Sequence, residues 1–275
     1  MAQSVATPTR EQVDAAIRQT VLAYSESWYT ADAARMERCI HAELVKRIVR
    51  PAEPPPAPWR PPGDWLDDMG ALRLVQVTRQ HQRRAPERPV ASEVRILDRF
   101  ENAASVKILD RDDVEYHHLA RWNGRWVIVN ILGGLRATAP PANPTAPAPG
   151  QGDRDDAAVT STARDYIESC YDADSARMER SLHPDLAKRI VHANASPAGD
   201  RFDKLSALGL VRLLRDGPSP GPRRAEVTIL DHAENAASVR IDASTWIDYM
   251  HIVRWNGRWA IVNVLWAVRP AAPTS

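Results

Sequence analysis

The chain of 275 residues carries one domain-sized sequence twice. Residues 24–49 and 166–191 are identical at 17 of 26 positions, and residues 94–136 and 227–269 at 24 of 43. A period of roughly 140 residues is too long for a solenoid repeat and fits a complete domain. We therefore predict two copies of one domain, over residues 9–136 and 153–270.

Two proline-rich stretches interrupt this pattern. Residues 137–152 (ATAPPANPTAPAPGQG) carry little that a core can bury, which predicts a semi-extended linker between the domains. Residues 50–63 (RPAEPPPAPWRPPG) lie inside the first copy, where the second copy has a different segment, residues 192–201. An insertion of this kind is either a lid over the mouth of a domain or a plain surface loop.

Each copy begins with sequence that favours helices. Apolar residues recur at helical spacing over residues 8–29, and Asp32 and Asp174 stand where an N-cap would open a short second helix. Residues 69–79 and 205–215 predict a third helix in each copy. Residues 44–49 fit a short strand or a helical turn.

The rest of each copy favours strands. Asn123-Gly124 and Asn256-Gly257 are strong signals for two-residue hairpin turns, because both turn positions need positive φ. With that turn, regular alternation places His118 opposite Val129 on one face and Asn130 on the other. Both faces are largely apolar, so both must be covered. Helices cover one face, and we expect the second copy to cover the other, giving an intrachain pseudo-dimer of α+β domains.

Composition and motifs exclude several classes of function. Lys and Arg number 36 against 35 Asp and Glu, with no basic stripe, which argues against nucleic-acid binding. No stretch approaches the ~20 apolar residues of a membrane helix, and the N-terminus lacks a signal-peptide core, so we expect a cytoplasmic protein. No GxGxxG, P-loop, CxxC or HExxH pattern occurs, so we expect no nucleotide cofactor and no metal.

The two cysteines argue against a repeated disulfide or metal site. Cys39 aligns with Ser181, and Cys170 aligns with Trp28, so neither thiol has a counterpart in the other copy. Each is either a buried spectator or a catalytic thiol, and the first is the commoner case.

Three runs of residues resemble one known family. They are Trp28-Tyr-Thr-Ala-Asp32 with Met36-Glu-Arg38, His183-Pro-Asp-Leu186, and Tyr249-x-His251 followed by Trp255-Asn-Gly-Arg-Trp-Ala-Ile-Val-Asn263. They resemble the nuclear transport factor 2-like superfamily, and within it the putative lumazine-binding family, which is related to the SnoaL-like proteins. The resemblance implies cone-shaped domains, each with N-terminal helices packed on a curved antiparallel sheet. It also implies a pocket between helices and sheet, used by some relatives for catalysis and by others for binding.

Eight polar residues that recur in both copies are candidates for acid–base catalysis. A Tyr and a His two apart on a strand point the same way, and a carboxylate in an apolar pocket can act as a base. Each residue also has a structural interpretation, as a helix-end, strand-end or domain-interface residue. The candidates are His41, Asp98, Tyr116, His118, His183, Asp231, Tyr249 and His251.

A second set suits the lining of a pocket for a planar ligand, because it combines aromatic rings with an Asn that interrupts an apolar strand. These residues are Tyr24, Trp28, Trp126, Asn130, Tyr166, Trp246, Trp259 and Asn263. The leading hypothesis is binding of a small apolar or aromatic molecule in one or both domains. The alternatives are a cofactor-independent lyase or isomerase and a non-catalytic scaffold. Whether the protein is an enzyme, and whether the pseudo-dimer associates further, stay open.

Overall fold

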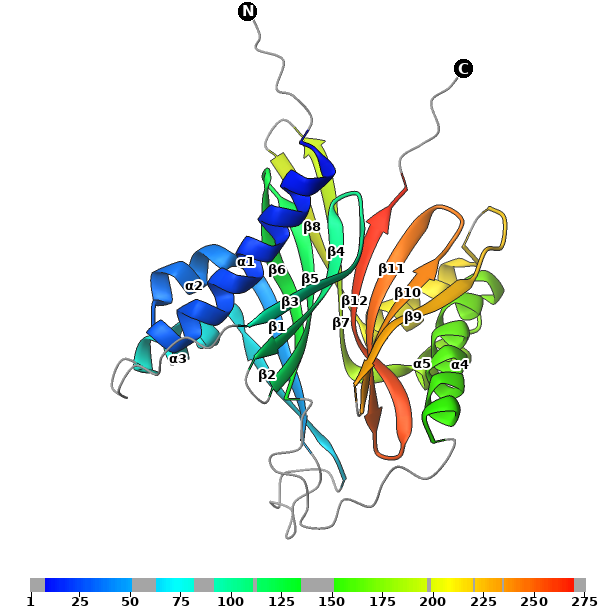
Figure 1. Ribbon diagram of the computed structural model, residues 1–275. Helices are drawn as coiled ribbons and strands as arrows, with labels where there is room; N and C mark the ends of the chain where they lie inside the picture. The colour runs from blue at the N-terminus through cyan, green and yellow to red at the C-terminus, as the bar shows by residue number, and fades with distance from the viewer. Residues whose placement is uncertain are drawn as a thin grey trace, which may run out of the picture.

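The computed structural model describes residues 8–50, 63–81, 92–110, 113–134, 151–196, 199–219, 221–233 and 235–269. Two six-stranded sheets face each other at the centre of the molecule, and the helices lie on the two outer sides (Figure 1). The expected pseudo-dimer of α+β domains is therefore confirmed. Most of the proline-rich insertion and residues 137–150 lie outside the described residues, and Gln151 and Gly152 already belong to a helix.

The first domain opens with two helices, and a third follows its first two strands, whereas the sequence predicted all helices before the strands. Local sequence sets where the first two helices begin. Thr9 caps the first helix and forms a reciprocal capping box with Gln12. Asp32 accepts a hydrogen bond from the backbone N–H of Arg35 at 2.9 Å, which confirms the predicted N-cap of the second helix. The helices are α1 (Arg10–Thr30), α2 (Ala33–Cys39) and α3 (Ala71–His81).

The first sheet has six strands in the order β2-β1-β6-β5-β4-β3. It departs from the expected purely antiparallel sheet, because β1 lies parallel to β6. The stretch expected as a short strand or turn is the long strand β1, which continues directly from α2. The strands are β1 (Ile40–Arg50), β2 (Trp65–Gly70), β3 (Glu93–Phe100), β4 (Ala103–Asp110), β5 (Asp113–Trp122) and β6 (Arg125–Gly133).

The second domain repeats this order, with β7 parallel to β12. Asp174 caps the second helix by accepting from the backbone N–H of Arg177 at 2.9 Å. The helices are α4 (Gln151–Asp172), α5 (Ser175–Ser181) and α6 (Ala207–Leu213), followed by a short 3-10 helix (Leu214–Asp216). The strands are β7 (Leu182–Ser196), β8 (Gly199–Ser206), β9 (Glu226–Ala233), β10 (Ala236–Asp242), β11 (Trp246–Trp255) and β12 (Arg258–Val268).

The hairpin turns form as predicted, but the register beyond them differs. Asn123 and Gly124 have φ of 46° and 82°, as the two-residue turn requires. Four residues from the turn, the pairing of β5 with β6 shifts at a β-bulge, so that His118 lies opposite Asn130 instead of Val129. A β-bulge inserts one extra residue and exchanges the faces of all residues beyond it. The second hairpin has the same bulge, which pairs His251 with Asn263.

The bulge moves two predicted pocket residues to the domain interface. Regular alternation predicted Asn130 and Asn263 on the same face as Trp126 and Trp259, and the bulge places them on the opposite face. The Asn130 amide donates to the carbonyl of Val264 in the other domain, and the Asn263 amide donates to that of Ile131, each at 3.3 Å. Each also bonds the histidine opposite it, His118 or His251.

A pseudo-twofold axis runs through this interface, since equivalent residues of the two domains meet there. The rings of His118 and His251 stack with centroids 3.7 Å apart, and the hydroxyls of Ser105 and Ser238 hydrogen-bond at 2.8 Å. Apolar side chains such as Val129 and Tyr249 fill the space around them. The second copy thus covers the apolar face that the sequence left exposed.

Each domain also has its own core between helices and sheet. In the first, Ile17, Tyr24 and Met36 from the helices pack on Leu119 and Trp126 of the sheet. In the second, an equivalent cluster surrounds Tyr166 and Trp259. We call these two helix–sheet spaces the first and second cones. None of the helices in the described residues is long and apolar enough to cross a membrane.

Candidate functional site

The predicted catalytic residues lie on the interface face of the sheets, outside the cones. Asp98 accepts hydrogen bonds from the Tyr249 hydroxyl at 2.9 Å and from Arg240 at 2.6 Å, both in the other domain. By pseudo-symmetry, Asp231 accepts from the Tyr116 hydroxyl and from Lys107. Burial, together with the neighbouring carboxylate, raises the pKa of both tyrosines. The Tyr and Asp candidates are therefore engaged in binding one domain to the other.

The four histidine candidates belong to the same interface. Burial lowers the pKa of His118 to about 3 and that of His251 well below its usual value. His41 stacks on Phe202 of the other domain, with ring centroids 3.9 Å apart. His183 packs edge-on against Trp255, and burial lowers its pKa to about 4. All four rings are thus held neutral near pH 7.

Six of the eight predicted ligand-binding residues do lie in the cones. Five are buried, and Trp28 is half-buried. They surround polar groups that the sequence analysis did not select. The six are Tyr24, Trp28 and Trp126 in the first cone and Tyr166, Trp246 and Trp259 in the second.

The first cone contains a buried ion pair bonded to a tyrosine. Lys46 of β1 donates from its Nζ to Oε1 of Glu115 at 2.5 Å and to the Tyr24 hydroxyl at 3.0 Å. The other carboxylate oxygen of Glu115 lies 2.9 Å from Nε2 of His117. The Lys46 and Glu115 side chains are 15% and 13% exposed, so both charges are largely removed from water.

Electrostatics hold this pair ionised. Burial favours the neutral form of Glu115, but the attraction of Lys46 and the bond from His117 outweigh it and lower the pKa to about 2. Burial likewise opposes the charge on Lys46, but Glu115 and Tyr24 raise its pKa above the usual value. Burial and the Glu115 charge raise the pKa of Tyr24, so its hydroxyl stays protonated.

The second cone repeats the cluster with different neighbours. Lys188 donates to the Tyr166 hydroxyl at 2.6 Å and to Oδ1 of Asp248 at 3.1 Å. The indole N–H of Trp246 donates to the other oxygen of Asp248 at 2.9 Å. The Lys188 and Asp248 side chains are 8% and 0% exposed. Met250 takes the position of His117, so this cone has no histidine beside its carboxylate.

Each lysine also faces a tryptophan ring, but the two rings come from different elements. In the first cone Lys46 lies 6.0 Å from the Trp28 ring of α1, while in the second Lys188 lies 5.3 Å from the Trp266 ring of β12. Position 170, equivalent to Trp28, is Cys, and position 133, equivalent to Trp266, is Gly. A side chain at Gly133 would meet Oε1 of Glu115 at 2.8 Å. Both copies thus place an indole ring near the equivalent lysine ammonium, but the tryptophan stands at a different position in each copy.

The sequence holds a signal for these residues that residue-type patterns alone do not show. Lys46 and Lys188 interrupt apolar strands in both copies, and an acid recurs as Glu115 and Asp248 while its neighbours change. Lys46 and Glu115 are 69 positions apart. They meet only because β6, which pairs with both β1 and β5, lies between their strands.

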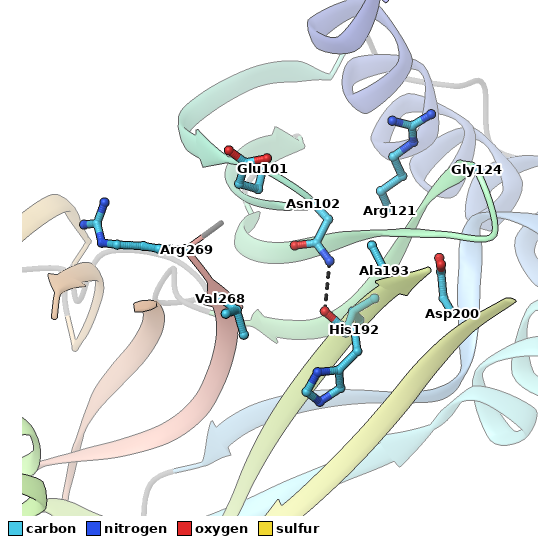
Figure 2. A pocket seen from close by; sticks show the side chains of 10 residues that line it. Glu101, Asn102, Arg121, Gly124, His192, Ala193, Asp200, Val268 and Arg269 are labelled. Carbon is cyan, nitrogen blue, oxygen red and sulfur yellow. Dashed lines mark hydrogen bonds between the residues drawn. The ribbon is translucent and has the colours of Figure 1, made fainter. Parts of the chain in front are cut away.

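A pocket of about 640 Å³ lies between the domains, away from the cones (Figure 2). It is lined by the turn residues Glu101 and Asn102, by Arg121, and by His192 and Arg269 of the second domain, and Asn102 donates to the Val191 carbonyl beside it. None of the predicted site residues lines it. A shallower groove of about 820 Å³ runs between α4, α5 and the start of β12 and reaches Trp259.

The two cysteines are buried in the helix–sheet cores. Burial raises the pKa of Cys39 to about 11 and that of Cys170 to about 12. Because the thiolate is the reactive form, we expect neither thiol of the folded protein to react with a chromogenic disulfide at pH 8. Both should react once the chain is unfolded in urea. Rapid labelling of one thiol in the native protein would contradict this and revive the catalytic-thiol interpretation.

The described residues contain no group of three or more His, Cys, Asp or Glu side chains that would hold a metal ion. Each cone holds an ammonium, a carboxylate and a phenol, and the first cone also holds the His117 imidazole. Such groups position a ligand by hydrogen bonds and charge, and they exchange protons without a bound cofactor.

Comparisons with solved structures and curated proteins gave the following. An NTF2-like protein of unknown function from Shewanella baltica is 21% identical, with 43% of this chain and 97% of that chain covered and a TM-score of 0.37. Another NTF2-like protein of unknown function, from Silicibacter pomeroyi, is 14% identical, with 43% of this chain and 98% of that chain covered and a TM-score of 0.37. A ketosteroid isomerase-like protein from Erwinia carotovora is 16% identical, with 43% of this chain and 92% of that chain covered and a TM-score of 0.30. A search of curated proteins found no match.

The family comparison covers both domains. The model described as putative lumazine-binding matches residues 12–132 and again residues 154–267. These two regions hold the helices, the sheets and both Lys–carboxylate clusters. The chain therefore belongs to the putative lumazine-binding family, of which it contains two copies in tandem.

Proposed function

We propose that each cone binds a small planar aromatic molecule against its buried Lys–Tyr–carboxylate cluster. The carrying observation is the occurrence of this cluster at equivalent positions in both domains, Lys46 with Tyr24 and Lys188 with Tyr166. A buried ion pair is weak support for stability, since apolar residues of similar volume often serve as well or better. Its presence at equivalent positions in both cones therefore supports a role other than stability.

The tryptophan over each lysine supports the same proposal. An indole facing an ammonium leaves a flat apolar surface beside a hydrogen-bond donor, which is the combination that small heterocyclic ligands require. Trp28 and Trp266 are half-buried, so we infer that they lie at the mouths of the cones and move when a ligand enters. The different origins of the two rings, and His117 against Met250, predict unequal affinities in the two cones.

The test begins with native mass spectrometry of the protein purified from its own host. A retained small molecule, one or two per chain, would support binding and give its chemical class. Lumazine is then titrated calorimetrically into the wild type and into Trp28→Leu and Trp266→Leu. Each variant is expected to weaken one of two unequal binding events about tenfold.

Trp122→Leu is the matched control, because this half-buried indole lies against His41 at the domain interface and not over a cone lysine. It should leave both binding events unchanged. A bare chain from the host, together with lumazine titrations that show no binding, would sink the proposal. Equal affinity in both cones would overturn only the predicted inequality.

One observation favours acid–base catalysis as a second function, confined to the first cone. If Nε2 of His117 donates to Glu115, its buried Nδ1 is an acceptor without a hydrogen-bond partner in the described structure. A carboxylate that orients a neutral imidazole is the usual arrangement of a general base. Any turnover of a bound ligand should disappear in His117→Met, which reproduces the second cone, while binding remains. Unchanged turnover in that variant would exclude His117 as the base.

A further inference from the structure

A second group of buried charges lies outside the cones, where β1 of the first domain meets β7 of the second. Arg47 and Arg189 are equivalent residues, each 6% exposed. They follow Lys46 and Lys188 along their strands, so alternation turns them away from the cones and toward the interface. Among the described residues, neither guanidinium lies within salt-bridge distance of a carboxylate. An arginine side chain nevertheless stays protonated in a protein, so both positive charges remain.

The hydrogen-bond donors of these arginines are poorly used. Buried Nε and Nη1 of Arg47 have no partner in the described structure. Within the described part of the chain, Arg189 donates to two backbone carbonyls, that of Glu43 at 3.3 Å and that of Lys188 at 3.4 Å, distances near the outer limit for a hydrogen bond. A buried donor without an acceptor costs free energy, and a buried cation without a counter-charge costs more.

Several cationic side chains act on one another here. Burial and, to a smaller extent, the nearby charge of Arg47 lower the pKa of Arg189 to about 10. Arg47 and Arg258 also act to lower the pKa of His183, whose buried Nε2 has no partner in the described structure. His183 accepts at Nδ1 from the backbone N–H of Asp185, so its Nε2 carries a hydrogen and is a further donor.

Nearby carboxylates do not complete the site. Asp68 and Asp185 attract Arg47 electrostatically, but no ion pair joins them in the described structure. Glu43 attracts Arg189, but its carboxylate is paired with Lys204 at 2.9 Å. The buried donors of the two arginines therefore lack a negatively charged hydrogen-bond acceptor.

We propose that Arg47 and Arg189 bind a small oxyanion, such as sulfate or phosphate, between the two domains. The guanidinium fork matches such an anion with two parallel N–H···O bonds, and pseudo-symmetry supplies one fork from each domain. Each arginine keeps a small exposed fraction, so the site lies just beneath the surface. An anion bound there bridges the domains and stabilises their pairing. This inference does not depend on the ligand proposed for the cones.

The experiment measures thermal unfolding of the full chain in sodium sulfate or sodium phosphate against sodium chloride of equal ionic strength. Sulfate or phosphate should raise the melting temperature with a saturating dependence on concentration. In Arg47→Gln and Arg189→Gln the apparent affinity for the anion should fall about tenfold to a hundredfold. Arg47→Lys keeps the positive charge but loses the two parallel donors of the guanidinium. Its apparent affinity for the anion should lie between those of the wild type and Arg47→Gln.

Arg50→Gln is the matched control, since Arg50 ends the same strand but is exposed at the surface. Its response to sulfate and phosphate should equal that of the wild type. Two results would overturn the proposal: no stabilisation beyond the chloride control with either anion, or equal responses in Arg47→Gln and Arg50→Gln. If Arg47→Gln does not fold, Arg189→Gln and Arg47→Lys are compared with Arg50→Gln in the same assay. Responses to the anion equal to that of Arg50→Gln would then overturn the proposal.

Discussion

Lys188→Met is expected to lower the free energy of unfolding by about 3–5 kcal/mol, because it leaves a buried carboxylate without its counter-charge. Asp248 has a fully buried side chain, and after the substitution the Trp246 indole would still donate to it, but its ion-pair partner would be gone. The compensated variant Lys188→Met with Asp248→Asn should recover most of this loss. Its amide oxygen still accepts from Trp246, and no charge remains in the core.

Urea unfolding of the two single variants and the double variant forms a double-mutant cycle that isolates the pair. Lys204→Met is the control. Lys204 is half exposed and pairs with Glu43 at the surface, so its loss should cost about 1 kcal/mol or less. A double variant as unstable as Lys188→Met would show that the pair itself is required for folding. That result would weaken the argument that the cluster is kept for a ligand.

The stability of the wild type should fall by about 5 kcal/mol between pH 6.5 and pH 3 through His118 alone. Burial lowers the pKa of His118 from 6.5 to about 3. Below pH 6.5 the unfolded chain therefore binds a proton that the folded chain does not. The contribution of neutral His118 to the free energy of unfolding is fully present above pH 6.5. It falls by about 1.4 kcal/mol per pH unit down to about pH 3.

His118→Phe should flatten this profile, because it keeps a ring to stack on His251 and removes the titrating group. Asn130 would still donate to the Val264 carbonyl. Equal slopes in wild type and His118→Phe would show that His118 becomes protonated within the folded interface.

Acid should also act first on the pairing of the domains. His118 and His251 lie in contact, and both are held neutral by burial, so protonation of both would place two like charges at stacking distance. Hydrogen exchange is therefore expected to rise in β5 and β11 before it rises in α1 or α4. A rise in α1 or α4 before β5 and β11 would contradict the assignment of these histidines to the interface.

The sequence by itself determined the features that depend on a few neighbouring residues. The repeat gave two domains, Asp32 and Asp174 began the second helices, and Asn-Gly pairs formed the hairpin turns. The apolar character of both sheet faces predicted that the two copies pack together. Each of these rests on local φ/ψ preference, on capping or on alternation, which act over one or two turns of chain.

The tertiary structure alone decided which residues share a site. One bulge in each hairpin reversed the alternation and carried Asn130 and Asn263 from the expected pocket to the interface. The strand order brought Lys46 to Glu115 across β6, and the facing sheets joined Asp98 to Tyr249. Strand alternation predicts a face only while the register is unbroken, and pairing between distant strands is set by packing of the whole sheet. The candidate sites therefore follow from register and strand order, which no local pattern encodes.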